Sequence, residues 1–188
     1  MRLSPKLAGL LLAGTMAAGV TAAAVPADAS TSSNFWEIIT LPQGIDGPLL
    51  CLQGGSQGSA VIQQPCDPNF ASTEQQWVPI SQGGDVFKFE NVASGLCMDA
   101  HGSASDDVPV IMWSCTANIS NTRWQWPIPS NHLQDTFPGL NPIQSRVSGS
   151  TGFCLDVPLA QTLPGLQMQI QRCNGTAAQD MWITHPVS

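Results

Sequence analysis

The sequence has few charged residues, and basic residues are especially scarce. Of its 188 residues, 10% are charged, with 6 Lys+Arg against 13 Asp+Glu and a formal net charge of −7. A general nucleic-acid-binding protein needs a basic surface that displaces counterions from phosphates, and the four basic side chains after residue 30 do not supply one. We therefore expect no nucleic-acid partner. Overall disorder is also excluded, because 43% of the residues are hydrophobic.

The motifs of common catalytic and metal sites are absent as well. No Cys-x-x-Cys pair occurs, and His101, His132 and His185 lack a metal-ligand spacing such as HxxxH. No serine lies in a Gly-x-Ser-x-Gly setting, and the adjacent Asp106 and Asp107 would point to opposite faces of a strand. We therefore expect no enzyme, no bound metal and no cofactor.

Turn-forming residues and tryptophans are what the sequence has in quantity. It contains 17 Gly, 15 Pro and 6 Trp, with the Trp residues scattered along the chain. This composition favours an all-β protein with many turns over a helical one.

The N-terminus has the pattern of a secretory signal peptide, which we place at residues 1–29. A short basic start precedes an apolar run over residues 7–24. Ala27-Asp28-Ala29 then places small residues at the two positions that signal peptidase recognises. A membrane anchor is the alternative, because the run is near the lower limit for a span, but its Ala/Gly-rich composition and the cleavage site favour export. We expect a secreted, extracellular protein without another membrane span.

Cleavage before Ser30 would remove Arg2, Lys6 and Asp28, which leaves 4 basic and 12 acidic residues and a net charge of −8. The remaining residues 30–188 suffice for one domain with a core of its own.

Six cysteines remain, and an even number in an exported chain indicates disulfides. Counting alone allows fifteen pairings. The order of cysteines and tryptophans is more informative, because it repeats three times: Cys51, Cys66, Trp77; then Cys97, Cys115, Trp126; then Cys154, Cys173, Trp182. The two cysteines of a set lie 15, 18 and 19 positions apart. A constant order with varying gaps indicates a repeat whose loops differ in length.

Each copy also repeats a pattern of about four short β segments. One precedes the first cysteine, one ends near it, one ends at the second cysteine, and one carries the tryptophan. Three such units can close around an axis, share one core and leave few free strand edges. We expect the three tryptophans in equivalent core positions. The disulfides should join the two central strands of each copy, as Cys51–Cys66, Cys97–Cys115 and Cys154–Cys173.

The threefold order of Cys-Leu/Met-Asp, apolar strand, Cys and a final Gln-x-Trp-like ending resembles the ricin B-type lectin family of β-trefoil carbohydrate-binding modules. The resemblance covers about residues 34–188, with repeats at about 34–82, 83–131 and 141–188. It implies a β-trefoil at residues 30–188 that binds carbohydrate, galactose-type sugars among them. We expect a monomer. Only Gln75-Gln76-Trp77 matches the ending; the other two read Trp124-Gln125-Trp126 and Asp180-Met181-Trp182.

The resemblance also implies where sugar would bind. In the family, an Asp after the first cysteine accepts hydrogen bonds from two ring hydroxyls, an aromatic ring two positions before the second cysteine stacks on the sugar, and an Asn three positions before the final Trp, with a Gln beside it, completes the site.

The second copy matches these positions best. It has Asp99 and Trp113, with His101 close by as a further donor, while Arg123 and Trp124 stand where the ending predicts Asn and Gln. Arg123 either covers Trp124 at the surface or donates to the sugar. Asp99 could instead cap its own turn, and Trp113 could belong to the core.

The other two copies depart further from the pattern. The third keeps Asp156, which could also cap its own turn, but has Gln171 for the aromatic ring and Gln179-Asp180 for the polar pair. The first has Gln53, Gln64 and Glu74 in the three positions, so we expect it to be structural. Two altered sites also favour an alternative, a trefoil that has lost sugar binding and contacts a protein, for instance as an inhibitor. Its variable loops at 101–107 and 132–142 would then carry the contact.

Overall fold

Twelve strands form among the residues that the structure describes, in the order that the repeats predict. The structure, a computed structural model, describes residues 35–42, 48–117, 119–126, 142–149, 152–179 and 181–184. The strands are β1 (Trp36–Thr40), β2 (Leu50–Gln53), β3 (Ile62–Pro65), β4 (Gln76–Gly83), β5 (Val86–Asn91), β6 (Leu96–Ala100), β7 (Val108–Ser114), β8 (Trp124–Gln125), β9 (Gln144–Ser145), β10 (Phe153–Asp156), β11 (Gln169–Arg172) and β12 (Met181–Thr184). The proposed signal peptide, most of the 132–142 insertion, and two of the histidines lie outside the described residues.

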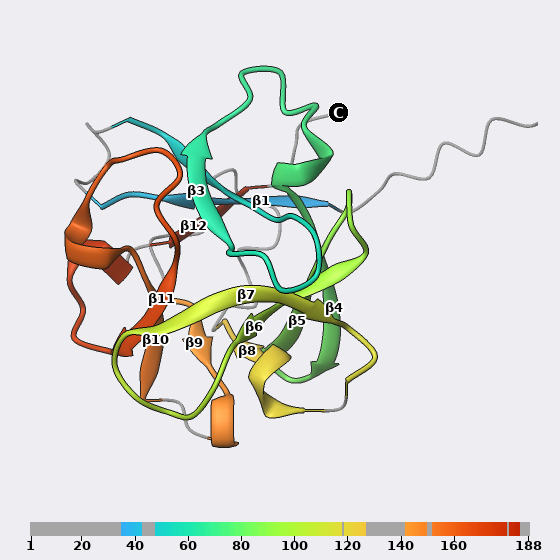
Figure 1. Cartoon of the computed structure of the whole chain (residues 1–188), viewed down its shortest axis with the longest axis vertical. Helices are drawn as coiled ribbons and strands as arrows, with labels where there is room; N and C mark the ends of the chain where they lie inside the picture. Colours follow the sequence, from blue (N-terminus) through green and yellow to red (C-terminus); the bar gives the residue numbers. More distant parts are fainter. Residues whose placement is uncertain are drawn as a thin grey trace, which may run out of the picture. The chain divides into compact units, whose positions relative to one another are not determined.

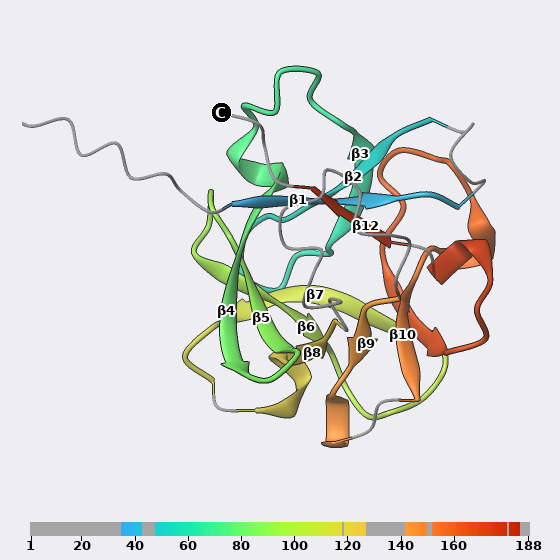
Figure 2. The same ribbon diagram turned by 180° about the vertical axis from the view of Figure 1, so that it is seen from behind.

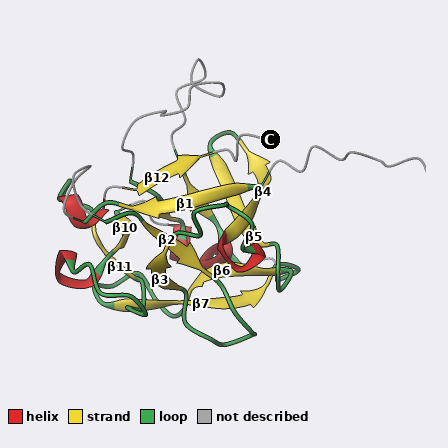
Figure 3. Ribbon diagram, turned by 90° about the horizontal axis from the view of Figure 1, so that it is seen from above, coloured by secondary structure: helices red, strands yellow, loops and turns green. Residues whose placement is uncertain are grey.

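Helices are limited to short 3-10 turns in the described part of the chain, and they connect the strands (Figure 3). They are η1 (Thr73–Gln75), η2 (Ser120–Thr122), η3 (Val147–Gly149), η4 (Pro158–Ala160) and η5 (Ala177–Gln179). Three of them, η1, η2 and η5, stand directly before the last strand of a repeat, so they mark equivalent places in the three copies.

The first and last strands of each repeat build a barrel wall. Antiparallel pairing links β1 to β4, β4 to β5, β5 to β8 and β8 to β9, and the last strand, β12, returns to pair with β1. Figure 1 shows β1 and β12 side by side although they come from opposite ends of the described chain. The two central strands of each repeat form a hairpin: β2–β3, β6–β7 and β10–β11.

The three hairpins meet at a pseudo-threefold axis. The Val61 N–H donates to the Val110 carbonyl at 3.0 Å, Val110 donates to Met168 at 2.9 Å, and Met168 donates back to Val61 at 2.8 Å. All three side chains are fully buried. A closed ring of one hydrogen bond per repeat is the three-way axis that the sequence repeats predict, and the fold is a β-trefoil.

The core repeats in layers of three. Ile38 of β1, Phe89 of β5 and Ile143, which directly precedes β9, are fully buried. Leu52, Met98 and Leu155, each directly after a first cysteine, form a second buried set. Since every repeat contributes one side chain to each layer, no repeat can bury its apolar residues without the other two.

The predicted disulfides are confirmed. Cys51–Cys66, Cys97–Cys115 and Cys154–Cys173 have Cα–Cα distances of 4.9, 5.0 and 5.1 Å. Each closes the hairpin of its own repeat.

The tryptophan alignment differs from the prediction in the second and third repeats. Trp77 is the second residue of β4 and pairs with the buried Asn91; Trp124 is the first residue of β8 and pairs with the buried Ser145. Each indole N–H donates at 3.1 Å to the carbonyl of the layer residue after the first cysteine, Leu52 or Met98.

Trp124, and not Trp126, is therefore the counterpart of Trp77. In the third repeat, Met181 opens β12, pairs with the buried Thr40 and is itself buried, so it stands at the same position. Trp126 is also buried, but it packs edge-on against Trp36 with ring centroids 5.4 Å apart. The Trp182 side chain lies outside the description.

Candidate functional site

Asp99 and Trp113 of the second repeat lie on paired strands. Asp99 is in β6 and Trp113 in β7, where Trp113 pairs with Cys97, two residues before Asp99. The Trp113 ring is half-buried, so it is neither a core residue nor fully exposed. His101, just beyond the end of β6, is exposed, and its ring lies 6.3 Å from the Trp113 ring at an angle of 40°. The structure thus brings these three predicted residues together.

The Asp99 carboxyl group is strongly buried. Only 2% of the residue is exposed, and its Oδ2 atom accepts no hydrogen bond from the described residues. Burial raises the pKa of Asp99 from 3.8 to about 6, while the nearby His101 opposes the shift. A buried acceptor without a donor is costly, and a ligand hydroxyl that donates to it would remove that cost.

Asn121 is a site residue that the sequence analysis did not assign. With Trp124 as the counterpart of Trp77, the residue three positions earlier is Asn121, where the family pattern has its Asn. It lies in η2, which packs against β6. Its amide donates to the Gly102 carbonyl at 3.2 Å, in the loop that follows Asp99. When the final motif is aligned on Trp126, Asn121 does not fall at the Asn position. The Asn-x-x-Trp spacing of Asn121 and Trp124 is the sequence signal that could have identified it.

Arg123 lies apart from this group. It follows η2, and its half-buried side chain lines a separate pocket together with Arg146.

The first repeat closes its own site. Gln53 and Glu74 occupy the positions of Asp99 and Asn121, and the Gln53 amide donates to the Glu74 carboxylate at 3.0 Å. Each of these two side chains thereby has the other as its hydrogen-bond partner. This contact is in keeping with the structural role expected for the first repeat.

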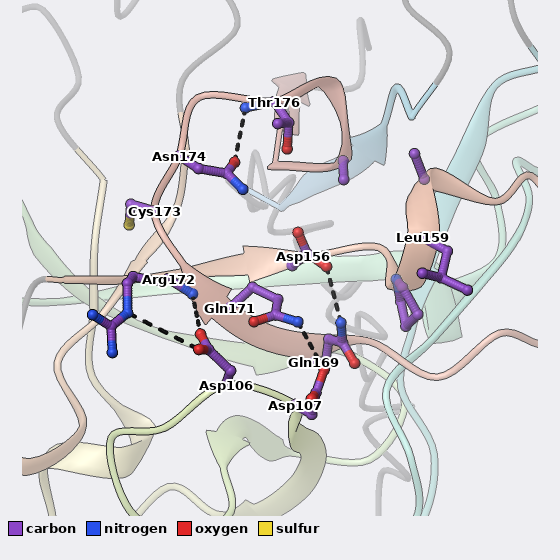
Figure 4. Close-up of a pocket in the computed structure, with 13 residues that line it drawn as sticks. Asp106, Asp107, Asp156, Leu159, Gln169, Gln171, Arg172, Cys173, Asn174 and Thr176 are labelled. Atoms are coloured by element: carbon purple, nitrogen blue, oxygen red, sulfur yellow. Dashed lines mark hydrogen bonds and ion pairs between the residues drawn. The ribbon is translucent and has the colours of Figure 1, made fainter.

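The third repeat carries a pocket of about 960 Å³ (Figure 4). Asp156 and Gln171 line it, as predicted site residues, and so do Asp106 and Asp107 from the β6–β7 loop of the second repeat. The Gln171 amide donates to Asp107 at 2.7 Å, and the Arg172 N–H donates to Asp106 at 2.7 Å. The pocket is therefore shared between two repeats, and none of its lining side chains is aromatic.

Asp156 is already hydrogen-bonded within the protein. Its Oδ1 accepts from Gln169 at 3.1 Å, and Gln179 also donates to it. Burial is the main cause that raises the pKa of Asp156; the two amide hydrogen bonds oppose the rise and the charge of Asp107 adds to it. The carboxylate has less capacity for a ligand than that of Asp99.

Gln179 forms hydrogen bonds with the backbone on both sides of Cys173, the second cysteine of the third disulfide. Its amide donates to the Arg172 carbonyl at 3.0 Å and accepts from the Asn174 N–H at 2.9 Å. Gln75 does the same around Cys66, donating to Pro65 at 3.0 Å and accepting from Asp67 at 2.9 Å. Gln75 and Gln179 are thus equivalent, and both are buried.

Among the described residues, no group of three or more His, Cys, Asp or Glu side chains is arranged to hold a metal ion. In the same part of the chain, no helix has the length and apolarity to cross a membrane.

Comparison with known proteins gives a family match. Residues 21–134 match the family described as the ricin-type beta-trefoil lectin domain. No curated protein matches the sequence.

Solved structures resemble the chain at low sequence identity. The designed 3-fold symmetric protein ThreeFoil is 22% identical with a TM-score of 0.64, over 80% of this chain and 98% of that one. A ricin B-like lectin of Macrolepiota procera, solved with lactose, is 16% identical with a TM-score of 0.59, over 83% and 98%. A mosquitocidal holotoxin is 16% identical with a TM-score of 0.63, over 82% of this chain but 17% of that one. At these identities the likeness shows the fold.

Proposed function

Because the chain belongs to the family of ricin-type β-trefoil lectin domains, we propose that it is a secreted, monomeric, non-enzymatic carbohydrate-binding module whose principal site is in the second repeat. Residues 1–29 would be its signal peptide and residues 30–188 its lectin domain. The three disulfides are consistent with an oxidising, extracellular compartment.

The arrangement of Asp99, Trp113 and Asn121 carries this proposal. A buried carboxylate oxygen that accepts no hydrogen bond from the described residues, a half-exposed indole and a side-chain amide are the three groups that a sugar ring needs. They supply an acceptor for hydroxyls, a face for its C–H groups, and a further polar contact. Since lactose is bound by a structural relative, β-galactosides are the first ligands to test.

Access to Asp99 requires a side chain to move, because the carboxyl group is 2% exposed. His101 is exposed and lies near both Asp99 and Trp113. A sugar would displace the imidazole from the Trp113 ring and take its place. Binding at one such shallow site is expected to be weak, so retention on a surface depends on multivalent glycan.

Affinity electrophoresis in gels that contain galactan, together with a glycan array, tests the proposal. Asp99→Ala and Trp113→Ala should each lower retention at least about tenfold, because each removes a direct sugar contact. Gln53→Ala and Gln64→Ala change the corresponding positions of the first repeat and should leave retention unchanged.

The third repeat provides the internal comparison. Asp156→Ala should have the smaller effect, because Asp156 is already paired with two amides. If Asp156→Ala abolishes retention and Asp99→Ala does not, the principal site lies in the 960 Å³ pocket instead.

The alternative function, protein binding by a trefoil with altered sugar sites, is favoured by the Gln53–Glu74 contact that closes the first repeat. Capture of a partner from culture medium that free sugars do not compete, together with no retention on any glycan, would establish this alternative and overturn the lectin proposal.

A further inference from the structure

The third-repeat pocket of about 960 Å³ is built by strand pairing between two repeats. β11 of the third repeat pairs with β7 of the second, with Gln169 opposite Pro109. Figure 2 shows the loop before β7 running beside β10. That loop ends in Asp107, whose carboxylate accepts a hydrogen bond from β11 at 2.7 Å. The pairing thus brings Asp107 of the second repeat into one pocket with Asp156 of the third.

The lining of this pocket carries an excess of negative charge. Asp106, Asp107 and Asp156 line it, and Arg172 is the one basic residue of the lining. Arg172 is paired with Asp106: its backbone N–H donates at 2.7 Å and its Nε lies 4.0 Å from the carboxylate. The hydrogen bonds to Asp107 and Asp156 come instead from neutral glutamine amides, as Figure 4 shows for one amide at each carboxylate. Two negative charges in the pocket are therefore not offset by Arg172.

These two charges act on each other. The charge of Asp107 adds to the burial that raises the pKa of Asp156. Asp156 is only 5% exposed, whereas Asp107 is exposed. A cation bound between the two carboxylates would turn their repulsion into attraction, and a charge pair at the buried Asp156 is screened less by salt than one at the surface.

The same pocket has an apolar edge that folding does not explain. Leu159 of η4 lines it and is 87% exposed, and Leu159 and Ala160 are held at φ of 56° and 52°. Strained backbone that presents a large apolar side chain to solvent is typical of a binding surface, where a ligand covers that side chain. A metal ion would not use this edge, and among the described residues no three His, Cys, Asp or Glu side chains are arranged to hold one. An organic cation with an apolar surface fits both features.

We propose that the third-repeat pocket binds a primary ammonium group between Asp107 and Asp156, carried by an amino sugar. An ammonium group has three N–H donors for the two carboxylates. The Gln169 and Gln171 amides line the pocket for contacts to hydroxyls, and Leu159 offers a surface for the C–H groups of the ring. The net charge of −8 on residues 30–188 attracts a polycationic glycan at long range. The amino sugar as carrier rests on the proposed function, whereas the ammonium site does not.

Titration of the protein with methylammonium chloride, followed by chemical shifts in NMR, tests the ammonium site. Sodium chloride at matched ionic strength is the reference. We expect saturable shifts at the side-chain amides of Gln169 and Gln171, and affinity lowered at least about tenfold in Asp107→Asn. This variant keeps the size of the side chain and an acceptor for Gln171. Asn also tolerates the φ of 62° at this position, so the charge is the main change.

Two variants serve as matched controls. Asp106→Asn removes the neighbouring charge, which Arg172 already offsets, and Asp85→Asn removes an exposed charge outside the pocket. Both should bind methylammonium within about threefold of the unchanged protein. Equal titrations in the unchanged protein and in Asp107→Asn, or the same shifts with sodium chloride, would overturn the proposal. A well-dispersed spectrum of Asp107→Asn establishes that it is folded.

A second arm identifies the carrier, below pH 7, where amino groups are protonated. A glucosamine oligomer should bind at least about tenfold more tightly than its uncharged N-acetylated counterpart, and Asp107→Asn should abolish this preference. Leu159→Ser should weaken binding of the glucosamine oligomer, because it removes the apolar edge.

A lysine peptide of equal length carries the same ammonium group without a sugar. If methylammonium binds through Asp107 and this peptide binds more tightly than the glucosamine oligomer, the amino sugar is refuted as the carrier and the ammonium site stands. Absence of lactose binding alone would contradict the proposed function and leave the ammonium site intact.

Discussion

Gln75 and Gln179 show how the amide group of a binding-motif residue can be used for hydrogen bonds within the protein itself. Each amide connects the two peptide groups that flank a second cysteine, using both its donor and its acceptor. In the second repeat the same position is Thr122, too short for this bridge. There the Lys88 ammonium group donates to the Cys115 and Ala117 carbonyls at 2.6 and 3.1 Å. The backbone around the disulfide is thus stabilised in all three repeats, by a glutamine in the first and third and by a lysine in the second.

Replacing Gln179 should therefore cost stability. Gln179→Ala leaves a carbonyl and an N–H without their partner and removes buried volume, so we expect a loss of about 2 kcal/mol in the free energy of unfolding. Urea denaturation measures it. Gln171→Ala is the control, because its hydrogen bond to Asp107 is exposed and should contribute less than about 0.5 kcal/mol. Equal losses in the two variants would contradict this role of Gln179.

Sugar binding should depend on the protonation of Asp99. The carboxylate accepts from sugar hydroxyls in its ionised form, and its pKa is raised to about 6. Affinity should therefore be constant above pH 7 and fall by up to about tenfold per pH unit below 6. Isothermal titration calorimetry with lactose from pH 4.5 to pH 8 measures the profile. Asp99→Asn should bind weakly at every pH; an unchanged profile in that variant would assign the titration to another group.

At the scale of elements, one glutamine of the first repeat anchors a loop of the third. The loop over residues 157–165 includes η4, where Leu159 and Ala160 have φ of 56° and 52°, and Leu159 is 87% exposed. The buried Gln63 of β3 donates its amide to the carbonyls of Gln161 and Leu163 at 2.8 and 3.0 Å. Two consecutive non-glycine residues at positive φ are strained, and these bonds help to fix that conformation.

Gln63→Ala should release this loop. We expect about 2 kcal/mol lower stability and at least about tenfold faster cleavage within residues 157–165 by a protease such as thermolysin, identified by mass spectrometry. Gln64→Ala, on the other face of the same strand, is the control. Cleavage at the same rate in both variants would show that the loop is held by other contacts.

The strands could be predicted because the cysteines mark both arms of every hairpin, and a four-strand repeat follows from that spacing. Asn121 was missed because Trp124 and Trp126 stand two residues apart, and only the pairing of Trp124 with Ser145 shows which one aligns with Trp77. Asp156 and Gln171 of the third-repeat pocket were among the predicted site residues, but the contribution of Asp106 and Asp107 from the second repeat could not be predicted. Asp107 meets Gln171 across 64 positions of sequence, a contact that no local spacing records.

At the scale of the whole molecule, several buried carboxyl groups make stability depend on pH. Glu37 is fully buried in β1, and its Oε1 accepts no hydrogen bond from the described residues. Burial, with a smaller contribution from the charge of Asp67, raises the pKa of Glu37 from 4.5 to about 7. The pKa values of Asp99 and Asp156 are raised as well. In the second repeat, the position of Glu37 is taken by Lys88.

A carboxyl group whose pKa is raised in the folded state stays protonated at pH values at which the same group in the unfolded chain is already ionised. Stability should therefore fall as pH rises from about 4.5 to 7 and level off above that range. Glu37→Gln should remove on the order of 2 kcal/mol of this fall. Guanidinium denaturation of both proteins at pH 4.5, 6 and 8 measures it. Parallel pH profiles would contradict the assignment to Glu37.

The pairing of β1 with β12 has a consequence for engineering. Glu37 lies opposite Thr184, so the two ends of the described fold are neighbours, and every disulfide stays within one repeat. A circular permutant that joins these ends and opens the exposed Gly83–Gly84 tip would keep all three crosslinks and the interlocking ring at Val61, Val110 and Met168. The trefoil could thus be reordered along the polypeptide without changing which residues meet.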